Sequence, residues 1–286
     1  MTRRMWLRAA ALGLAAAGVI AGLAVYFSSE GNPPCFVSGI ATWRPPSGNA
    51  THRYLVVFPD RAACFFDLED HERLVGSLRL AEAHDITMAA PNDDRVALRT
   101  AAGPMTLDLR TGRTARDGLV PWASDTVTVP DAQHDAMYVT QRGHLGFRVI
   151  DLRNGLTRFV LHFKGFTWNP SFGPNPPSHG LSLAPDRSEL WVLDAPNSNV
   201  HLYDVSALPH QPPRPVESIR LSKTVTGIGS LLHSTDGRFV FVGDEGDVID
   251  TKTNETVVNL EALQHSRVAL EVDWVHGRPG FPGFPR

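Results

Sequence analysis

A short pattern recurs along most of this 286-residue chain and limits the folds that the chain can adopt. Each copy has a turn that carries an Asp or Asn, followed by an Asp near the end of an apolar strand. These strand-end residues, separated by 41 to 53 positions, are Asp67, Asp108, Asp151, Asp204 and Asp250. A repeat of about 40–50 residues with several short strands is typical of a chain built from many small antiparallel sheets.

The clearest copy of the repeat is residues 178–206, SHGLSLAPDRSELWVLDAPNSNVHLYDVS. Its apolar stretches at 180–184, 189–194 and 199–205 are separated by clusters of Pro, Asp, Asn and Ser. Short alternating stretches between such turn residues predict three antiparallel strands. An aspartate carboxylate at the end of a strand can accept N–H bonds from the following turn. We therefore expect the five strand-end aspartates to be structural.

Five units can be traced, and one strand at residues 268–274 is left over without a unit of its own. In a ring of sheets the last strand must pair with the first part of the chain, because this removes the open edges. We expect its partners near residues 35–43 and 54–58. The prediction is an all-β fold, a β-propeller of five to seven four-stranded antiparallel blades over residues 35–275. The Gly/Pro-rich tail at 276–286 is expected to be irregular.

The N-terminus predicts export from the cytoplasm. Arg3, Arg4 and Arg8 flank an uncharged apolar run at residues 9–27. A run of about twenty apolar residues can span a bilayer, and preceding basic residues keep that end in the cytoplasm. We expect an uncleaved transmembrane anchor at 1–27, a linker at 28–34 and an extracytoplasmic domain. A cleaved signal peptide, which would give a secreted protein, is the alternative.

The composition argues against several partners and cofactors. The formal net charge is −3, which predicts no nucleic-acid-binding face. Cys35 and Cys64 are the only cysteines, and no further Cys or His pair lies at zinc-finger spacing, so no metal is expected. The two cysteines can form a disulfide outside the cytoplasm, or can be two half-buried strand cysteines. We find no GxSxG, HExxH, P-loop or GxGxxG motif and expect no cofactor.

From about residue 143 to residue 274 the chain resembles bacterial exported β-propellers with YVTN-type repeats, in the quinoprotein amine dehydrogenase-like and WD40-like superfamily. The stretches that carry the resemblance are GHLGFRVIDL, GFTWNPSFGPNPPSHGLSLAPD, ELWVLDAPNSNVHLYDVS, HSTDGRFVFVGDEGDVIDTKTN and ALEVDW. The resemblance implies a secreted or membrane-anchored propeller, usually of seven blades, with no settled catalytic set. This chain is short for seven blades.

Alignment of the units on their turns suggests a binding surface. Asp85, Ser124 and His179 fall at the start of the innermost strands, where side chains would line a central channel. The insertion at residues 164–177 precedes His179 and is too rich in Pro, Gly and Asn for a strand. Long loops on rigid scaffolds often bind ligands, and this one offers aromatic contacts through Phe166, Trp168 and Phe172. The alternatives are polar caps on the channel strands and a loop that packs on its own blade.

Two functions remain open from the sequence. The first is a non-catalytic extracytoplasmic module that binds an unidentified protein or small molecule. The second is a channel-mouth enzyme, such as a metal-assisted lactonase or another hydrolase. Such an enzyme needs several carboxylate or Asn ligands, and Asp85 is the one clear carboxylate at the aligned position. His233 replaces an apolar residue of the repeat, so we expect a partly buried imidazole with satisfied hydrogen bonds.

Overall fold

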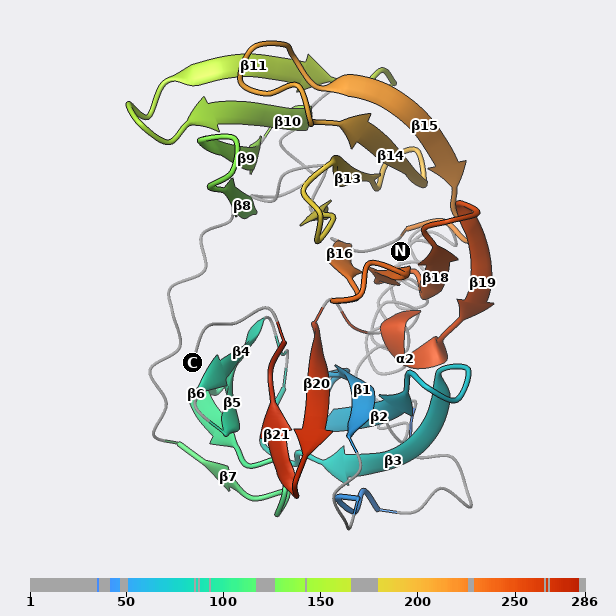
Figure 1. Cartoon of the computed structure of the whole chain (residues 1–286). Coiled ribbons are helices and arrows are strands. Elements are labelled where there is room, and N and C mark those ends of the chain that lie inside the picture. The colour runs from blue at the N-terminus through green and yellow to red at the C-terminus, as the bar shows by residue number, and fades with distance from the viewer. Residues whose placement is uncertain are drawn as a thin grey trace, which may run out of the picture. The chain divides into compact units, whose positions relative to one another are not determined.

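Figure 1 shows the computed structural model of the chain. The structure describes residues 35, 42–46, 51–84, 86, 88–92, 94–116, 127–141, 143–165, 180–225, 229–264, 266 and 268–282. All of these residues belong to the unit Pro33–Arg286. The expected membrane segment at 1–27 and the expected linker at 28–34 both lie outside the described residues. Within the described part, no helix combines the length and the apolar character that a membrane crossing requires.

The described residues form five antiparallel sheets, and four of these contain four strands that are consecutive in the chain (Figure 1). Sheet 2 contains β4 (Met88–Asn92), β5 (Arg95–Thr100), β6 (Gly103–Leu107) and β7 (Thr114–Ala115). Sheet 3 contains β8 (Thr128–Asp131), β9 (Ala136–Gln141), β10 (His144–Asp151) and β11 (Thr157–His162). Sheet 4 contains β12 (Leu181–Leu183), β13 (Glu189–Asp194), β14 (Asn199–Asp204) and β15 (Arg214–Arg220). Sheet 5 contains β16 (Ser230–His233), β17 (Phe239–Gly243), β18 (Asp247–Asp250) and β19 (Glu255–Asn259).

Sheet 1 joins the two ends of the domain. Its order is β21 (Arg278–Gly280), β20 (Ala269–Val275), β1 (His52–Val57), β2 (Ala62–Asp67) and β3 (Arg73–Arg79). β20 is antiparallel to β1, with Tyr54 opposite Val272. The predicted closure between the last strand and residues 54–58 is therefore confirmed.

Two details of the predicted closure differ from the structure. Of the stretch at 35–43 the structure describes Cys35, Thr42 and Trp43, and Thr42 makes a parallel bridge to Ser77 of β3 rather than to β20. The tail is not irregular throughout, because Arg278–Gly280 forms β21 on the far side of β20. β21 is an edge strand, where a proline such as Pro279 removes no ladder bond that the sheet requires.

The predicted strands of residues 178–206 agree with β12, β13 and β14 to within two residues at each end. The structural role of the strand-end aspartates is also confirmed, because each carboxylate accepts backbone N–H bonds from the turn that follows. The donors are Glu69 to Asp67, Arg110 and Thr111 to Asp108, Arg153 to Asp151, Ser206 to Asp204, and Lys252 and Thr253 to Asp250. The sequence repeat therefore marks one type of turn in all five sheets.

Alternating side chains of one strand pack against two different neighbouring sheets. Leu190 and Val192 of β13 pack against sheet 3, whereas Trp191 and Leu193 pack against sheet 5. In β1, Tyr54 and Val56 pack against sheet 2, whereas Leu55 and Val57 pack against sheet 5. Successive side chains of a strand point to opposite faces of the sheet. When both faces are buried, the sequence of the strand is therefore a continuous run of apolar residues. Successive four-stranded sheets packed face to face in this way are consistent with a β-propeller.

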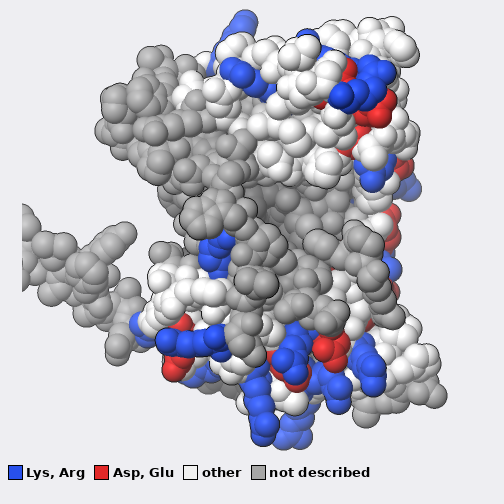
Figure 2. Space-filling model, turned by 90° about the vertical axis from the view of Figure 1, so that its left-hand side faces the viewer, with Lys and Arg blue, Asp and Glu red and all other residues white. Residues whose placement is uncertain are grey.

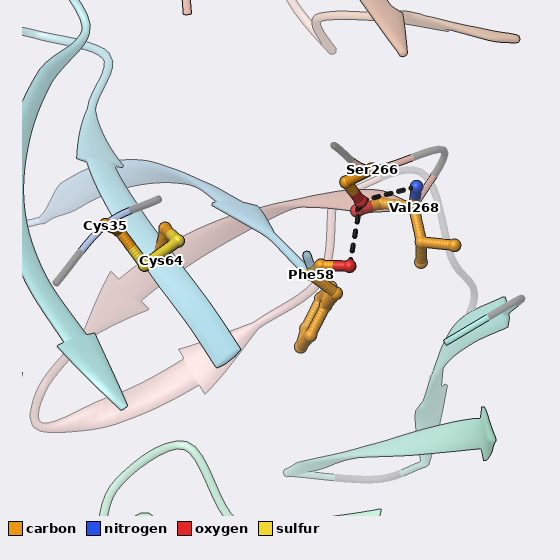
Figure 3. Close-up of a disulfide and its surroundings, with 5 residues drawn as sticks. All are labelled: Cys35, Phe58, Cys64, Ser266 and Val268. Carbon is orange, nitrogen blue, oxygen red and sulfur yellow. Dashed lines mark hydrogen bonds between the residues drawn. A yellow bond between two sulfur atoms is a disulfide. The ribbon is translucent and has the colours of Figure 1, made fainter. Parts of the chain in front are cut away.

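Covalent and polar bonds reinforce sheet 1. A disulfide joins Cys35 to Cys64 of β2, with the Cα atoms 5.8 Å apart and both residues buried (Figure 3). This is one of the two states that the sequence left open. Nearby, the Ser266 hydroxyl lies 2.8 Å from the carbonyl oxygen of Phe58 and 2.9 Å from that of Val268. These contacts connect the end of β1 to the segment that leads into β20.

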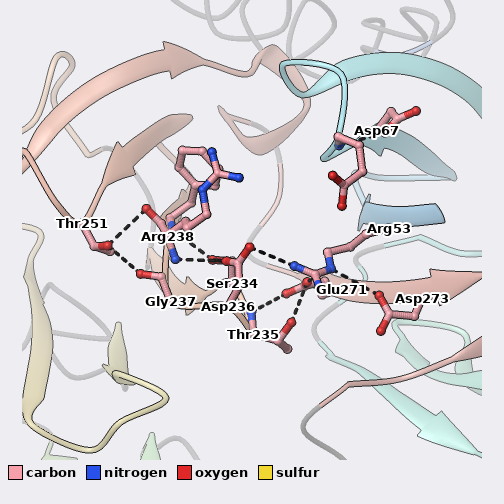
Figure 4. Close-up of polar contacts among 12 residues, drawn as sticks. Arg53, Asp67, Ser234, Thr235, Asp236, Gly237, Arg238, Thr251, Glu271 and Asp273 are labelled. Carbon is pink, nitrogen blue, oxygen red and sulfur yellow. Dashed lines mark hydrogen bonds and ion pairs between the residues drawn. The ribbon is translucent and has the colours of Figure 1, made fainter. Parts of the chain in front are cut away.

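A polar network also ties sheet 1 to sheet 5 (Figure 4). The Glu271 carboxylate on β20 accepts bonds from the backbone N–H and the hydroxyl of Thr235, at 2.6 and 2.7 Å. The Arg53 guanidinium on β1 lies between Asp236, Glu271 and Asp273, at 2.9 to 3.3 Å. Burial raises the pKa of Glu271, although the bonds from Thr235 and the charge of Arg53 act in the opposite direction. The network fixes the turn before β17 against the closing strand.

Candidate functional site

The six residues that the sequence suggested as a ligand surface lie outside the described residues. They are Asp85, Ser124, Phe166, Trp168, Phe172 and His179. Their grouping around a channel mouth stays a prediction. The structure does describe the first two residues of the insertion, Lys164 and Gly165, together with Phe163 before it and Gly180 beyond it.

A polar cleft of about 730 Å³ opens where this insertion begins. It lies beside the outer strands of sheet 4, which supply His201 and Tyr203 from β14 and Ser218 and Arg220 from β15. The other lining residues come from the end of β11, the turn after β13 and the segment after β15: His162, Phe163, Lys164, Asp194, Pro196, Asn197, Ser198, Asn199 and Thr224. The Asn197 amide donates to the carbonyl oxygen of Lys164 at 3.1 Å, so the turn of sheet 4 holds the start of the insertion.

Three side chains in the cleft form a hydrogen-bonded chain across three adjacent strands. The His201 Nε2 lies 3.0 Å from Asp194 Oδ2, and the His201 Nδ1 lies 2.7 Å from Ser218 Oγ. A carboxylate only accepts, so Nε2 carries the proton that it donates to Asp194. In the neutral imidazole Nδ1 is then the acceptor, and the Ser218 hydroxyl donates to it. This polarity directs the lone pair of the imidazole toward the serine.

The sheet and the turn hold this chain in place. Asp194 ends β13, and its side chain is only 2% exposed. The backbone N–H and the side-chain amide of Asn197 both donate to its carboxylate, at 2.9 to 3.2 Å. On the other side, the Phe163 ring packs against the His201 imidazole with centroids 4.4 Å apart. The aspartate and the histidine are therefore positioned, whereas Ser218 is exposed to solvent.

The charges around the cleft are mostly positive. Asp194 is the only carboxylate among the lining residues, and its oxygens already accept the bonds described above. Lys164 and Arg220 contribute full positive charges, and Arg220 also donates to the Asn197 carbonyl. Burial raises the pKa of the Tyr203 phenol, so this group stays neutral at pH 7. The two cationic side chains outnumber the one carboxylate, and that carboxylate already accepts hydrogen bonds from Asn197 and His201. The cleft therefore favours a ligand with an anionic group.

Charge elsewhere on the described surface is mixed. In the face shown in Figure 2, acidic side chains lie between the basic ones along the lower edge and at the upper right. Arg116 and Glu82, for example, form an exposed ion pair with the charged atoms 3.0 Å apart. The described residues of this face form no continuous basic track of the kind that follows a nucleic-acid backbone. In the described part of the chain, no cluster of three or more His, Cys, Asp or Glu side chains is arranged to hold a metal.

The prediction for His233 is wrong in two respects, because the residue is buried rather than partly buried and only one of its ring nitrogens has a partner. Its Nδ1 does have a partner, since it lies 2.8 Å from the Ser182 hydroxyl. Its Nε2, however, is buried and has no hydrogen-bond partner among the described residues.

Sequence reasoning missed the residues at the centre of the cleft. His201 and Tyr203 alternate with apolar residues in NVHLYD, which marks them as side chains of one face of β14. That signal could have placed them together, but it could not have found Ser218. If the pairing is counted from the connection between β14 and β15 without a bulge, His201 falls opposite Glu217. A bulge at Leu202 and Tyr203 shifts the register by one residue, so that His201 lies opposite Ser218 instead. Such a shift moves side chains between faces, and no motif in the sequence announces it.

Comparisons with known proteins identify neither a family nor an activity for this chain. No protein-family model matches the chain, and no curated protein matches it. Among solved structures, it is similar to the β-propeller domain of Myceliophteria thermophila Cps50 (Swd1), with 16% identity and a TM-score of 0.37, over 79% of this chain and 78% of that one. It is also similar to the dihydro-heme d1 dehydrogenase NirN in complex with DHE, with 15% identity and a TM-score of 0.37, over 78% of this chain and 48% of that one. Similarities at this level assign no family and no activity.

Proposed function

We propose that this chain is a membrane-anchored, extracytoplasmic β-propeller that binds an anionic ligand or partner in the cleft of sheet 4. The apolar run at residues 9–27 behind three arginines supports the anchor and the orientation. The disulfide between Cys35 and Cys64 supports an oxidising compartment, because such bonds are rare in the cytoplasm.

The observation that carries this proposal is the cleft itself. Its volume of about 730 Å³ lies in the range of small-molecule sites, about 300–1,000 Å³. Its walls are strands and a hydrogen-bonded turn, so little ordering is required when a ligand binds. Lys164 and Arg220 can pair with a carboxylate or a phosphate, and the Phe163 and Tyr203 rings supply apolar contact area.

Thermal shift and calorimetric titration with inorganic phosphate, citrate and galacturonate test the binding proposal. We expect at least one of these anions to raise the melting temperature of the native protein. The double variant Lys164→Ala/Arg220→Gln should reduce the affinity at least tenfold. The matched control Lys252→Ala/Arg214→Gln removes two exposed cations outside the cleft and should leave the affinity unchanged. Equal responses in both double variants would refute the site.

Protease accessibility tests the location. After the outer envelope of the cell is opened, added protease should digest residues beyond 34, while a cytoplasmic marker protein stays intact. Full protection of the domain under these conditions would contradict an extracytoplasmic location. Extraction by detergent but not by high salt would separate an anchored protein from a secreted one.

A second function, hydrolysis of esters, is favoured by the chain of Ser218, His201 and Asp194. A nucleophile within hydrogen-bond reach of a base, which is oriented by a third group, is the arrangement of nucleophilic hydrolases. Ser218 Oγ would attack an ester carbonyl while its proton moves to His201 Nδ1. That proton would then leave with the alcohol, and water would hydrolyse the acyl-serine by the same route. Asp194 would balance the positive charge on the imidazole, and Lys164 or Arg220 would face the oxyanion.

Two measurements separate this enzyme from a binding module. A fluorophosphonate probe should label Ser218 in the native protein and not in Ser218→Ala, as peptide mass spectrometry can determine. Hydrolysis of p-nitrophenyl butyrate should fall by at least a hundredfold in Ser218→Ala and in His201→Gln. An unlabelled Ser218, with hydrolysis that the variants do not change, would leave the cleft as a binding site only.

A further inference from the structure

A second pocket, of about 350 Å³, lies between sheets 4 and 5 and shares no lining residue with the first cleft. The turn between β12 and β13 supplies one wall, and Trp191 of β13 and His233 of β16 lie beside it. The remaining wall residues are Asp236, Gly237 and Thr251 of sheet 5 and its turns. We propose that this pocket binds a neutral ligand with several hydroxyl groups, such as a monosaccharide unit.

The first argument is a buried nitrogen that faces the pocket. His233 is only 7% exposed, and its Nε2 has no hydrogen-bond partner among the described residues. The opposite edge of the ring is fixed, because Nδ1 lies 2.8 Å from the Ser182 hydroxyl. His233 lines the pocket whereas Ser182, the partner of Nδ1, does not, and from this we infer that the ring edge that carries Nε2 is the edge nearer to the pocket. An unpaired polar atom at such a depth costs about 1–3 kcal/mol, and a ligand group that pairs with it removes this cost.

The second argument concerns the protonation of this imidazole. Burial lowers the pKa of His233 to about 4, although the nearby Asp186 carboxylate acts in the opposite direction. The ring is therefore neutral at pH 7 and has one N–H. The Ser182 oxygen accepts the backbone N–H of His233 at 3.0 Å and can still either donate to Nδ1 or accept from it. Nε2 is a donor in the first case and an acceptor in the second.

The third argument is the set of acceptors around the pocket. Asp186 accepts from the N–H and the hydroxyl of Ser188, and Glu189 accepts from the Trp191 indole. Asp236 accepts from Arg53, Ser234 and the N–H of Arg238. These bonds hold the three carboxylates in fixed directions. Each carboxylate has about four acceptor sites, so all three retain capacity for a ligand.

These groups exclude most ligand classes. An anion would be repelled by three carboxylates. A cation that offers only donors would satisfy the carboxylates but would leave Nε2 unpaired in the tautomer that carries the Nε2–H. The described residues here form no cluster that could hold a metal ion. A hydroxyl group both donates and accepts, so it pairs with the carboxylates and with Nε2 in either tautomer.

The size and surroundings of the pocket agree with one sugar ring. A volume of about 350 Å³ lies at the lower end of small-molecule sites. The Trp191 ring meets His233 edge to face at 5.5 Å, which fixes the imidazole plane from the core side. Several acceptors at fixed positions around one ring-sized space match a ligand with hydroxyls at several carbons. A single alcohol would leave most of these groups unpaired.

Saturation-transfer NMR at pH 7 tests the proposal with D-glucose, D-mannose, D-galactose and myo-inositol at millimolar concentration. At least one of them should receive saturation from the native protein, with a dissociation constant that calorimetry can measure. His233→Phe removes Nε2 while it keeps an aromatic ring, and it should weaken this binding at least tenfold. Asp186→Asn changes a turn side chain and should weaken binding several-fold, with a melting temperature near that of the native protein. Asp186→Asn can therefore test the proposal even if His233→Phe does not fold.

Controls distinguish this site from the first cleft and from non-specific contact. Ser218→Ala should leave sugar binding unchanged, and phosphate should not compete with it. With saturating phosphate present to occupy the first cleft, glucuronate should bind more weakly than glucose, because the carboxylates of the pocket repel its charge. No saturation transfer to any of the four neutral probes would overturn the proposal, and so would equal transfer in the native protein and in Asp186→Asn. Neither result depends on whether the anion site exists.

Discussion

Sheet 1 and sheet 4 show two ways to build the same kind of sheet. Sheet 4 forms from one continuous segment, in which each strand pairs with the next through a short connection. Sheet 1 joins β20 near the C-terminus to β1 near the N-terminus, a pairing across more than 200 residues of sequence. Closing such a long loop costs conformational entropy, so sheet 1 needs interactions that sheet 4 does not.

The additional interactions are visible in sheet 1. The disulfide, the Ser266 hydroxyl and the contacts of Glu271 all connect segments that are distant in sequence. In sheet 4, the corresponding polar side chains instead line a cleft at the outer strands and a pocket beside the inner turn. Both faces of the sheet are buried against neighbours, so its polar groups lie at its ends and its outer edge. The comparison suggests that sheet 1 closes the fold and that sheet 4 carries its binding groups.

The largest expected effect comes from the core of the closing sheet. Trp274 on β20 is 1% exposed and packs edge to face with Trp43 at 5.7 Å. Trp274→Ala should lower the free energy of unfolding by about 3–5 kcal/mol, because it leaves a large cavity in the core that joins sheets 1 and 2. Urea unfolding followed by fluorescence measures the change.

The control for Trp274→Ala is Val216→Ala on the outer strand of sheet 4, where Val216 is 54% exposed. This change should cost less than about 0.5 kcal/mol. Similar losses in the two variants would contradict the view that sheet 1 holds the fold together.

The disulfide should give the next largest effect. Cys35 and Cys64 close a loop with a sequence separation of 29. In the chain-entropy treatment such a bridge contributes about 3–4 kcal/mol to the free energy of unfolding. The double variant Cys35→Ala/Cys64→Ala should lose about this amount, and reductant should destabilise the native protein but not the variant. An unfolding curve that reductant does not move would show that the bond contributes nothing to sheet 1.

Much of the fold could be predicted from the sequence because its determinants are local. The alternation in ELWVLD and NVHLYD and the turn residues between them set β13 and β14. Asp204 and its four counterparts were identified with the correct role, since a carboxylate and the next turn are neighbours in sequence. The closing strand was found from an unpaired apolar stretch, which needs a partner in any closed sheet system.

The remaining features depend on register and on distant contacts. Thr42 bridges β3 rather than β20, and no local pattern distinguishes these two partners. The pairing of His201 with Ser218 depends on a bulge between β14 and β15. Whether His233 Nε2 has a hydrogen-bond partner depends on which side chains of the neighbouring sheet lie next to it. The predicted ligand residues Asp85, Ser124 and His179 lie outside the described residues, so that surface stays a prediction.

The pH dependence of stability should report on the pocket beside sheet 4. The pKa of His233 is lowered to about 4 in the folded protein, against about 6.5 for a free histidine. The unfolded state therefore binds the proton at higher pH, and the free energy of unfolding should fall as the pH is lowered from about 6.5 to 4. The contribution of this residue should be about 2–3 kcal/mol.

The measurement compares the native protein with His233→Phe by urea unfolding at pH 7 and at pH 4.5. Glu271 and Glu245, whose pKa values are raised, act in the opposite direction, and they do so in both proteins. The difference between the two proteins should therefore isolate His233. A difference that does not change with pH would show that this imidazole is solvated in the native state.

The smallest expected effect is on the other side of sheet 4. Ser218 lies on an exposed edge strand, and its hydroxyl makes one hydrogen bond, to His201. Ser218→Ala should change the free energy of unfolding by less than about 0.5 kcal/mol, since water can replace a partner at an exposed site. The matched change Asp194→Ala removes a buried acceptor of bonds from Asn197 and His201, and should cost about 1–3 kcal/mol. Both variants can be unfolded in urea beside Trp274→Ala. A loss above 1 kcal/mol in Ser218→Ala would show that the three-residue chain stabilises sheet 4 and is not held ready for a ligand.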